Sequence, residues 1–296
     1  MLLTQQGASQ MEGYEQIIKA VEGMPDLPGT VHAILAKDSA GECGAVEFME
    51  TLGRDPVFSL KLLRLVNSSF CEKNEDAASL QRAAVFLGTR TLHNLAVGLA
   101  CVGRFPAVGI RGVEAGEFWL HSLASGVCAR LLAERMGASI EESTEYFLAG
   151  VLHDIGKLVM VGAAEAEYTK VLSMASEPGC ALVDAEMEVL GVSHPEVGAM
   201  LTARWNLSAD VTEAVKLHHV PAASSGNLMT FCVHAGNEIA KMLSFGSAGD
   251  FEVHDLPPVV EKRFGMSLRE LADDLGDLDA EVDRARIFIK LAEAGA

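Results

Sequence analysis

A histidine and an aspartate stand side by side inside an apolar stretch of the chain. His153 and Asp154 interrupt an apolar run that begins at Tyr146 and resumes at Leu158. An aspartate in such a run must be paired, hydrogen-bonded or bound to a metal, because an unpaired buried charge is strongly unfavourable. A neighbouring histidine is a common second metal ligand, but a hydrogen bond at a helix end is an equally simple explanation. The fold must bury both polar groups with suitable partners.

Further histidines flank this pair. His121 lies 32 positions before His153, and His194 lies 40 positions after Asp154. Imidazole and carboxylate groups together suit Fe, Mn, Co and Zn ions. The alternatives are therefore a metal site or a set of unrelated core and surface histidines. With an acidic residue one helical turn before His121, the additional candidates are Glu117, His121, His194, His218 and His219.

Composition favours a helical protein. Hydrophobic residues make up 49% of the 296 residues and aromatic residues only 6%, so the core should be aliphatic and rich in alanine. The length suffices for one large or two modest domains. The net charge of −18 argues against a nucleic-acid partner, which requires a basic face. A small anionic ligand at one local basic spot is still compatible with it.

The chain lacks the sequence signals of membrane and secreted proteins. It has no run of 18 uninterrupted apolar residues, and its N-terminus does not follow the plan of a signal peptide. The six cysteines include no C-x-x-C pair, which is typical of small buried residues in a reducing compartment. We therefore expect a cytoplasmic protein that does not contact a membrane.

The first part of the chain is predicted to be a bundle of short helices. Residues 1–12 are polar and featureless, and we expect them to form a disordered leader. Apolar residues at helical spacing then predict helices at 14–22, 31–37 and 46–52. Asp55-Pro56 is a start signal for the next helix, with Asp as N-cap and Pro at the first helical position. No alternating strand pattern occurs there.

A Gly- and Pro-containing link at 105–112 is the best candidate for an internal boundary. It divides an N-terminal helical part, residues 13–110, from a second helical domain, residues 111–296. A long helix is predicted over 114–136, with Glu117 and His121 on one face. The next helix runs from about Glu142 into the His153-Asp154 pair.

The later helices place the remaining histidines. Ser193 and Glu196 form a capping box, which predicts that His194 lies in a first helical turn. A short helix from Val211 ends at His218-His219. A strong helix over 228–243 follows, and the acidic amphipathic helix at 278–292 is expected to serve for packing or as a partner surface.

The order of these residues resembles a known superfamily. A His, a His-Asp pair, a His and a His-His pair, with Lys157 three residues after the Asp, are similar to the HD superfamily of metal-dependent phosphohydrolases, and closest to its HD-GYP branch. Leu27-Pro28, Asp55-Pro56, and the phrases at 62–68 and 83–88 are similar, in that order, to the N-terminal part of the HDOD domain, the HD-related output domain of bacterial signalling proteins. The resemblance implies an all-α fold with a helical N-terminal part followed by an HD-like helical domain.

The resemblance also implies two ligand sets that share Asp154. His121, His153 and Asp154 would hold a first ion, with Glu117 close by. Asp154, His194 and either His218 or His219 would hold a second, and the metals would be Fe, Mn or Zn. Two such ions can clamp a phosphate ester, and Lys157 could neutralise a phosphate oxygen.

Two departures argue against catalysis. The late Asp of the superfamily falls, by register, on Asn237, and a neutral amide is a weaker metal ligand. The Gly-Tyr-Pro signature is absent, because His218-His219 are followed by Val220-Pro221. We therefore expect a non-catalytic signal-transduction module that acts on a protein partner or binds a small phosphorylated ligand. The alternative is a metal-dependent phosphohydrolase acting on a nucleotide. His234 and His254 fall outside the pattern and are expected to be structural.

Overall fold

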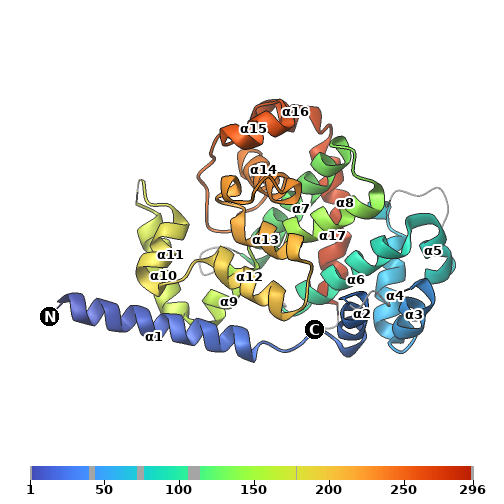
Figure 1. Ribbon diagram of the computed structural model, residues 1–296, viewed down its shortest axis with the longest axis horizontal. Coiled ribbons are helices and arrows are strands. Elements are labelled where there is room, and N and C mark those ends of the chain that lie inside the picture. The colour runs from blue at the N-terminus through green and yellow to red at the C-terminus, as the bar shows by residue number, and fades with distance from the viewer. Residues whose placement is uncertain (1, 40–43, 72–76, 106–113, 178, 295–296) are drawn as a thin grey trace.

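The computed structural model describes residues 2–39, 44–71, 77–105, 114–177 and 179–294, and the described residues contain helices but no strand (Figure 1). This confirms the all-α prediction. The N-terminal helices are α1 (Leu2–Gly23), α2 (Gly29–Ser39), α3 (Ala45–Leu52), α4 (Pro56–Val66), the short 3-10 helix η1 (Ser69–Cys71), α5 (Leu80–Leu87) and α6 (Thr89–Val102).

The remaining helices form the HD-like part. They are α7 (Ala115–Arg135), α8 (Ile140–Leu152), α9 (Ile155–Ala163), α10 (Glu165–Ala175), α11 (Leu182–Leu190), α12 (His194–Arg204), α13 (Ala209–Leu217), η2 (Pro221–Ala223), α14 (Leu228–Met242), α15 (Pro258–Phe264), α16 (Leu268–Asp274) and α17 (Leu278–Glu293).

Local sequence signals explain where several helices begin. The Asp55 carboxylate accepts a hydrogen bond of 2.9 Å from the Phe58 amide, so the predicted N-cap of α4 is confirmed. Ser139 and Glu142 form a capping box at α8 that the sequence analysis did not identify.

The N-terminal helix is longer than expected. Residues 2–12, for which we predicted a disordered leader, belong to α1 in the structure. α1 lies along α9, α11 and α12 at the edge of the molecule (Figure 1). Ile17 and Val21 are buried, and the Gln10 side chain donates a hydrogen bond to the Met187 carbonyl. Burial of an apolar face on the HD-like part stabilises this helix.

Three helices form the centre of the HD-like part. α7 packs against both α8 and α14. α7 and α8 approach so closely that a Cβ atom at Gly150 would lie 2.5 Å from the Cα of Gly126. Only glycines permit this contact. The close crossing brings His121 of α7, the end of α8 and the middle of α14 to one place in the core.

The C-terminal helix joins the two parts. α17 packs against α4, α6 and α7, and Phe288 packs against both Phe70 and Phe147, with ring centroids 6.4 and 5.3 Å away. Arg130 pairs with Glu281 at 3.0 Å. The N-terminal part therefore shares one continuous core with the HD-like part. Most of the predicted link, 106–112, lies outside the described residues.

One helical stretch of the described residues, Ile140–Ala163, is long and apolar enough to cross a membrane. It comprises α8, the His153-Asp154 pair and α9, and 83% of its apolar window is buried inside the protein. α5 and α6 meet the same criteria only when they are joined across a bend of 116°. Burial of this kind is typical of a core helix.

Candidate metal centre

Six helices bring the candidate residues together. His121 projects from α7, and His153 and Asp154 form the corner between α8 and α9. α12 begins at His194, where the reciprocal bonds of the predicted capping box are present. His218 is the C-cap of α13, His219 follows it, and Asn237 lies in α14.

The Asp154 carboxylate lies at the centre of the cluster. Its Oδ2 atom faces the first ligand set, at 3.3 Å from His153 Nε2 and 3.8 Å from His121 Nε2. The same oxygen accepts a hydrogen bond of 2.8 Å from Lys157 Nζ. On this side, therefore, a protein ammonium group already lies against the shared carboxylate.

The Oδ1 atom of Asp154 faces the second ligand set. His194 Nε2 lies 3.1 Å and His218 Nε2 lies 3.7 Å from this oxygen. His219 completes the set, with its Nε2 3.2 Å from that of His194. Among the described residues, no group makes a hydrogen bond of good geometry with Oδ1. Asp154, His194, His218 and His219 could together hold a metal ion, as could His121, His153 and Asp154.

Hydrogen bonds orient the imidazoles for metal binding. His153 Nδ1 donates to the Gly150 carbonyl at 2.7 Å, and His218 Nδ1 donates to the Val215 carbonyl at 2.8 Å. Since a carbonyl can only accept, Nδ1 carries a proton in each ring, and Nε2 is the nitrogen left to face an ion. Both Nε2 atoms are buried without a hydrogen-bond partner in the described part of the chain. Buried polar atoms are normally satisfied, so these orphaned atoms fit a bound cation.

His194 is held by a carboxylate that the sequence analysis missed. Glu186 Oε2 accepts bonds from His194 Nδ1 at 2.7 Å and from the His194 amide at 2.8 Å. Glu186 Oε1 accepts a bond of 2.8 Å from the Tyr168 hydroxyl. Such carboxylate–histidine contacts fix the ring and increase its basicity as a ligand. A buried glutamate among the apolar positions of α11 was the available signal.

Burial and neighbouring charges set the protonation states. Burial, together with the charge of His153, lowers the pKa of His121 to about 3. Burial, followed by the neighbouring histidines, also lowers the pKa of His218 and His219 well below the usual value. These three rings are neutral at physiological pH, which is the form that binds metals.

The pKa values of Asp154 and His194 are shifted by competing effects. Burial alone would raise the pKa of Asp154, but the charges of His153 and Lys157 hold it well below the usual value. Burial lowers the pKa of His194, and Glu186 with Asp154 more than reverses this effect.

Asn237 lies where the register places it. Its Oδ1 atom lies 3.0 Å from His121 Nε2, and its Nδ2 atom donates to Glu238 at 3.1 Å. An amide oxygen can only accept, so His121 donates from Nε2 in this arrangement. That proton occupies the nitrogen which would otherwise face an ion in the first set.

The structure also gives the positions of Glu117, Lys157, His234 and His254. The Glu117 side chain is exposed at the start of α7 and lies outside both ligand groups, so the structure does not place it at the site. Lys157 is buried against Asp154. His234 Nδ1 donates to the His218 carbonyl at 2.7 Å, which is a structural contact, and His254 lies at the surface.

The cluster is closed to solvent. His121, His153, Asp154, Lys157, His194, His218 and Asn237 each expose 2% or less of their surface, and only His219 is partly buried. A backbone contact closes one side, because a Cβ atom at Gly156 would lie 2.1 Å from the His194 carbonyl oxygen. The site resembles the interior of a domain more than a cleft for a substrate.

Comparison with known proteins places this fold. The HDOD domain family model matches residues 24–221. An uncharacterized protein of Treponema pallidum is 26% identical over 205 residues, which are 69% of this chain and 39% of that protein. The chain thus spans well under half the length of this relative.

Solved structures show the same architecture. An HDOD domain protein of unknown function from Geobacter sulfurreducens gives a TM-score of 0.73 at 22% identity, covering 95% of this chain and 97% of that chain. A candidate phosphohydrolase from Shewanella amazonensis gives 0.71 at 23% identity, covering 94% and 98%. A candidate signal transduction protein from Marinobacter aquaeolei gives 0.71 at 19% identity, covering 96% and 66%. Because the family model matches more than half of the chain and the helices follow the same architecture, this protein belongs to the HDOD domain family.

Proposed function

We propose that this chain is a non-catalytic signal-transduction module in which one bound divalent ion stabilises the HD-like part. The closed cluster carries this proposal. A phosphoester needs a concave, accessible site, whereas the candidate ligands lie in the core. The output would be a surface that a partner protein recognises.

The second ligand set supports a single ion. Asp154 Oδ1 and His218 Nε2 are buried without hydrogen bonds from the described residues, and Glu186 orients His194. In the first set, Lys157 already pairs with Asp154, and Asn237 engages His121. We therefore expect Asp154, His194, His218 and His219 to hold one ion of Fe, Mn or Zn. Bound only by the folded state, that ion would stabilise the fold.

Net charge and family membership support a protein partner for this module. The net charge of −18 disfavours nucleic acid, so a protein is the expected partner. A solved relative in fold is a candidate signal transduction protein, and we place this chain in cytoplasmic signalling of the bacterial type. A small phosphorylated ligand would require a basic spot away from the closed cluster.

The alternative is a metal-dependent phosphohydrolase acting on a nucleotide. The two oxygens of Asp154 face the two ligand sets, as a site for two ions requires. A protein of the same fold from Shewanella amazonensis is a candidate metal-dependent phosphohydrolase. When bound, two ions would polarise a phosphoryl oxygen and activate water. This function would require the core around Lys157 to open.

Hydrolysis assays separate the two functions. Protein incubated with Fe, Mn or Zn is assayed with bis(p-nitrophenyl) phosphate, cyclic dinucleotides and nucleotides, beside Asp154→Ala as the blank. The proposal predicts equal rates for both proteins, together with a melting temperature that falls on chelation. Metal-dependent turnover that Asp154→Ala abolishes would establish the hydrolase instead.

A further inference from the structure

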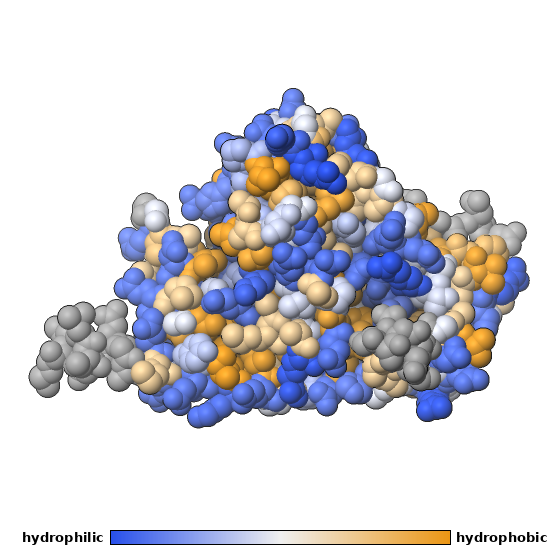
Figure 2. Space-filling model, viewed as in Figure 1, coloured by the Kyte–Doolittle hydropathy of each residue, from blue (hydrophilic) through white to orange (hydrophobic). Residues whose placement is uncertain are grey.

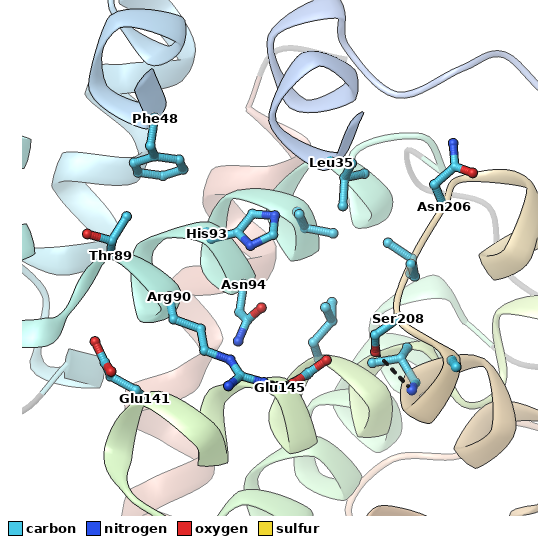
Figure 3. A pocket seen from close by; sticks show the side chains of 15 residues that line it. Leu35, Phe48, Thr89, Arg90, His93, Asn94, Glu141, Glu145, Asn206 and Ser208 are labelled. Carbon is cyan, nitrogen blue, oxygen red and sulfur yellow. Dashed lines mark hydrogen bonds and ion pairs between the residues drawn. The ribbon is translucent and has the colours of Figure 1, made fainter. Parts of the chain in front are cut away.

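A cavity lies between the N-terminal helices and the HD-like part. This cavity, of about 780 Å³, opens between α2, α3 and α6 on one side and α8 and the α12–α13 turn on the other (Figure 3). It shares no lining residue with the metal cluster. Cavities at the junction of two structural parts are preferred positions for small ligands.

The cavity has an apolar floor and a polar rim. Phe48, Val97, Leu148 and Val211 line the floor and are each at least 96% buried. Figure 3 shows Arg90 and Glu145 along one edge, and Asn206 and Ser208 on the opposite side. A buried apolar surface with a few polar groups at its rim is the usual plan of a site for a small organic molecule.

Two amides supply directional hydrogen-bonding groups. Asn94, on α6, donates from Nδ2 to the Thr144 hydroxyl at 3.3 Å, which leaves its oxygen as an acceptor beside the cavity. Asn206 is exposed in the α12–α13 turn, where its positive φ of 56° is a conformation that asparagine tolerates. A ligand with both N–H donors and ring acceptors would satisfy these groups.

The negative charge of the cavity rim disfavours phosphorylated ligands. The Arg90 guanidinium is engaged by the Glu145 carboxylate at 2.6 Å. Glu141 adds a second carboxylate to the lining. One arginine against two glutamates gives the rim a formal charge of −1, which repels a phosphate.

We infer that this cavity binds an uncharged nitrogen heterocycle of the nucleobase or nucleoside class, between the apolar floor and the two asparagines. The partly exposed His93 ring, which meets the buried Phe48 ring in an edge arrangement with centroids 6.3 Å apart, supplies the aromatic surface for a flat ligand. The inference goes beyond the proposed function and does not depend on a metal. A ligand there would contact both parts of the chain and favour their observed arrangement.

Binding of defined probes tests this inference. Adenosine, guanosine, cytidine and uridine are titrated into the full chain by calorimetry, beside their 5′-monophosphates, with and without a chelator. We expect at least one nucleoside to bind about tenfold or more tightly than its monophosphate, and chelation to leave this binding unchanged. If no nucleoside binds at millimolar concentration, or if each monophosphate binds more tightly than its nucleoside, the inference is wrong.

Two variants locate the binding. Ala209 is exposed and lines the cavity, so Ala209→Trp should fill it and weaken nucleoside binding about tenfold or more, whereas Ala166→Trp, on the exposed face of α10, should not. Asn94→Leu removes the buried acceptor and should weaken binding by a similar factor. Unchanged affinity in both cavity variants would place the nucleoside elsewhere and overturn the inference.

A charge variant tests the reason for the selectivity. Glu145→Gln removes one negative charge from beside Arg90. The monophosphate should therefore gain affinity, and the ratio of nucleoside to monophosphate affinity should fall about threefold or more. Glu188→Gln, on the exposed face of α11, is the matched control. An unchanged ratio in Glu145→Gln would contradict the assigned role of the rim charge.

Discussion

The two sides of Asp154 differ although both are lined by histidines. On the Oδ1 side, His194 and His218 present ring nitrogens to an oxygen without hydrogen bonds from the described residues. On the Oδ2 side, Lys157 supplies a cation and Asn237 engages His121. The same carboxylate is thus prepared for a metal on one side and neutralised by the protein on the other. The number of histidines alone does not determine the number of ions.

Removing the shared carboxylate should have the largest effect. Asp154→Ala would leave Lys157 buried without its counter-charge and would abolish metal binding, so we expect a loss of about 3–5 kcal/mol in the free energy of unfolding. Urea denaturation measures this free energy. The control Asp184→Ala, on the exposed face of α11, should change it by about 0.5 kcal/mol or less. Equal stabilities of the two variants would contradict the buried pairing.

Weakening the second set through Glu186 should reduce metal affinity without removing a ligand. Glu186→Gln keeps the shape of the side chain but loses the charge that holds His194, so we expect about 10–100-fold weaker metal binding. Competition with a chromogenic chelator measures it, and Glu188→Gln is the exposed control. If the two variants bind metal equally, Glu186 only supports packing.

A negative charge added to the first ligand set should make it bind a metal ion as the second set does. Asn237→Asp places an anionic oxygen beside His121, and we expect metal occupancy to rise by up to about one equivalent. Without metal, the new carboxylate would face Glu238, so the apoprotein should be about 1–3 kcal/mol less stable than the wild type. Unchanged occupancy on elemental analysis would remove Asn237 from the site.

The smallest effect is expected at Glu117. Its side chain is exposed outside both ligand groups, so Glu117→Gln should leave metal content unchanged and stability within about 0.5 kcal/mol. Elemental analysis and thermal unfolding measure both quantities. A halved metal content would return Glu117 to the first set.

Local sequence signals predicted much of the fold and the helices that carry the candidate ligands. The Asp55 cap, the capping box before His194 and the helix that carries Asn237 all depend on residues close in sequence, and the structure contains each of them. The apolar spacing of α7, α8 and α14 also identified the helices that meet at the centre.

The failures concern contacts between distant segments. Glu117 shares a helix face with His121 but lies nearer the exposed end of α7, which periodicity cannot reveal. The length of α1 depends on packing against α9, α11 and α12. Glu186 reaches His194 from another helix, and its place among the apolar positions of α11 does not identify that partner. The cavity requires helices from both parts of the chain.

Exposed apolar residues show the same limit. Figure 2 shows apolar surface at the edge of the molecule over α5, where Val85 and Phe86 expose 81% and 59% of their surface. Only the packing of α5 against α3, α4 and α6 shows which face of this apolar helix remains outside.

The metal content of untagged protein, purified without chelators or added metal, tests the central claim most directly. Elemental analysis should find about one equivalent of Fe, Mn or Zn in the wild type, retained in His121→Ala and lost in His218→Ala, because only the second set holds the ion. About two equivalents, with one lost in each variant, would contradict the single-ion account. Less than about a tenth of an equivalent in the wild type would contradict metal binding altogether.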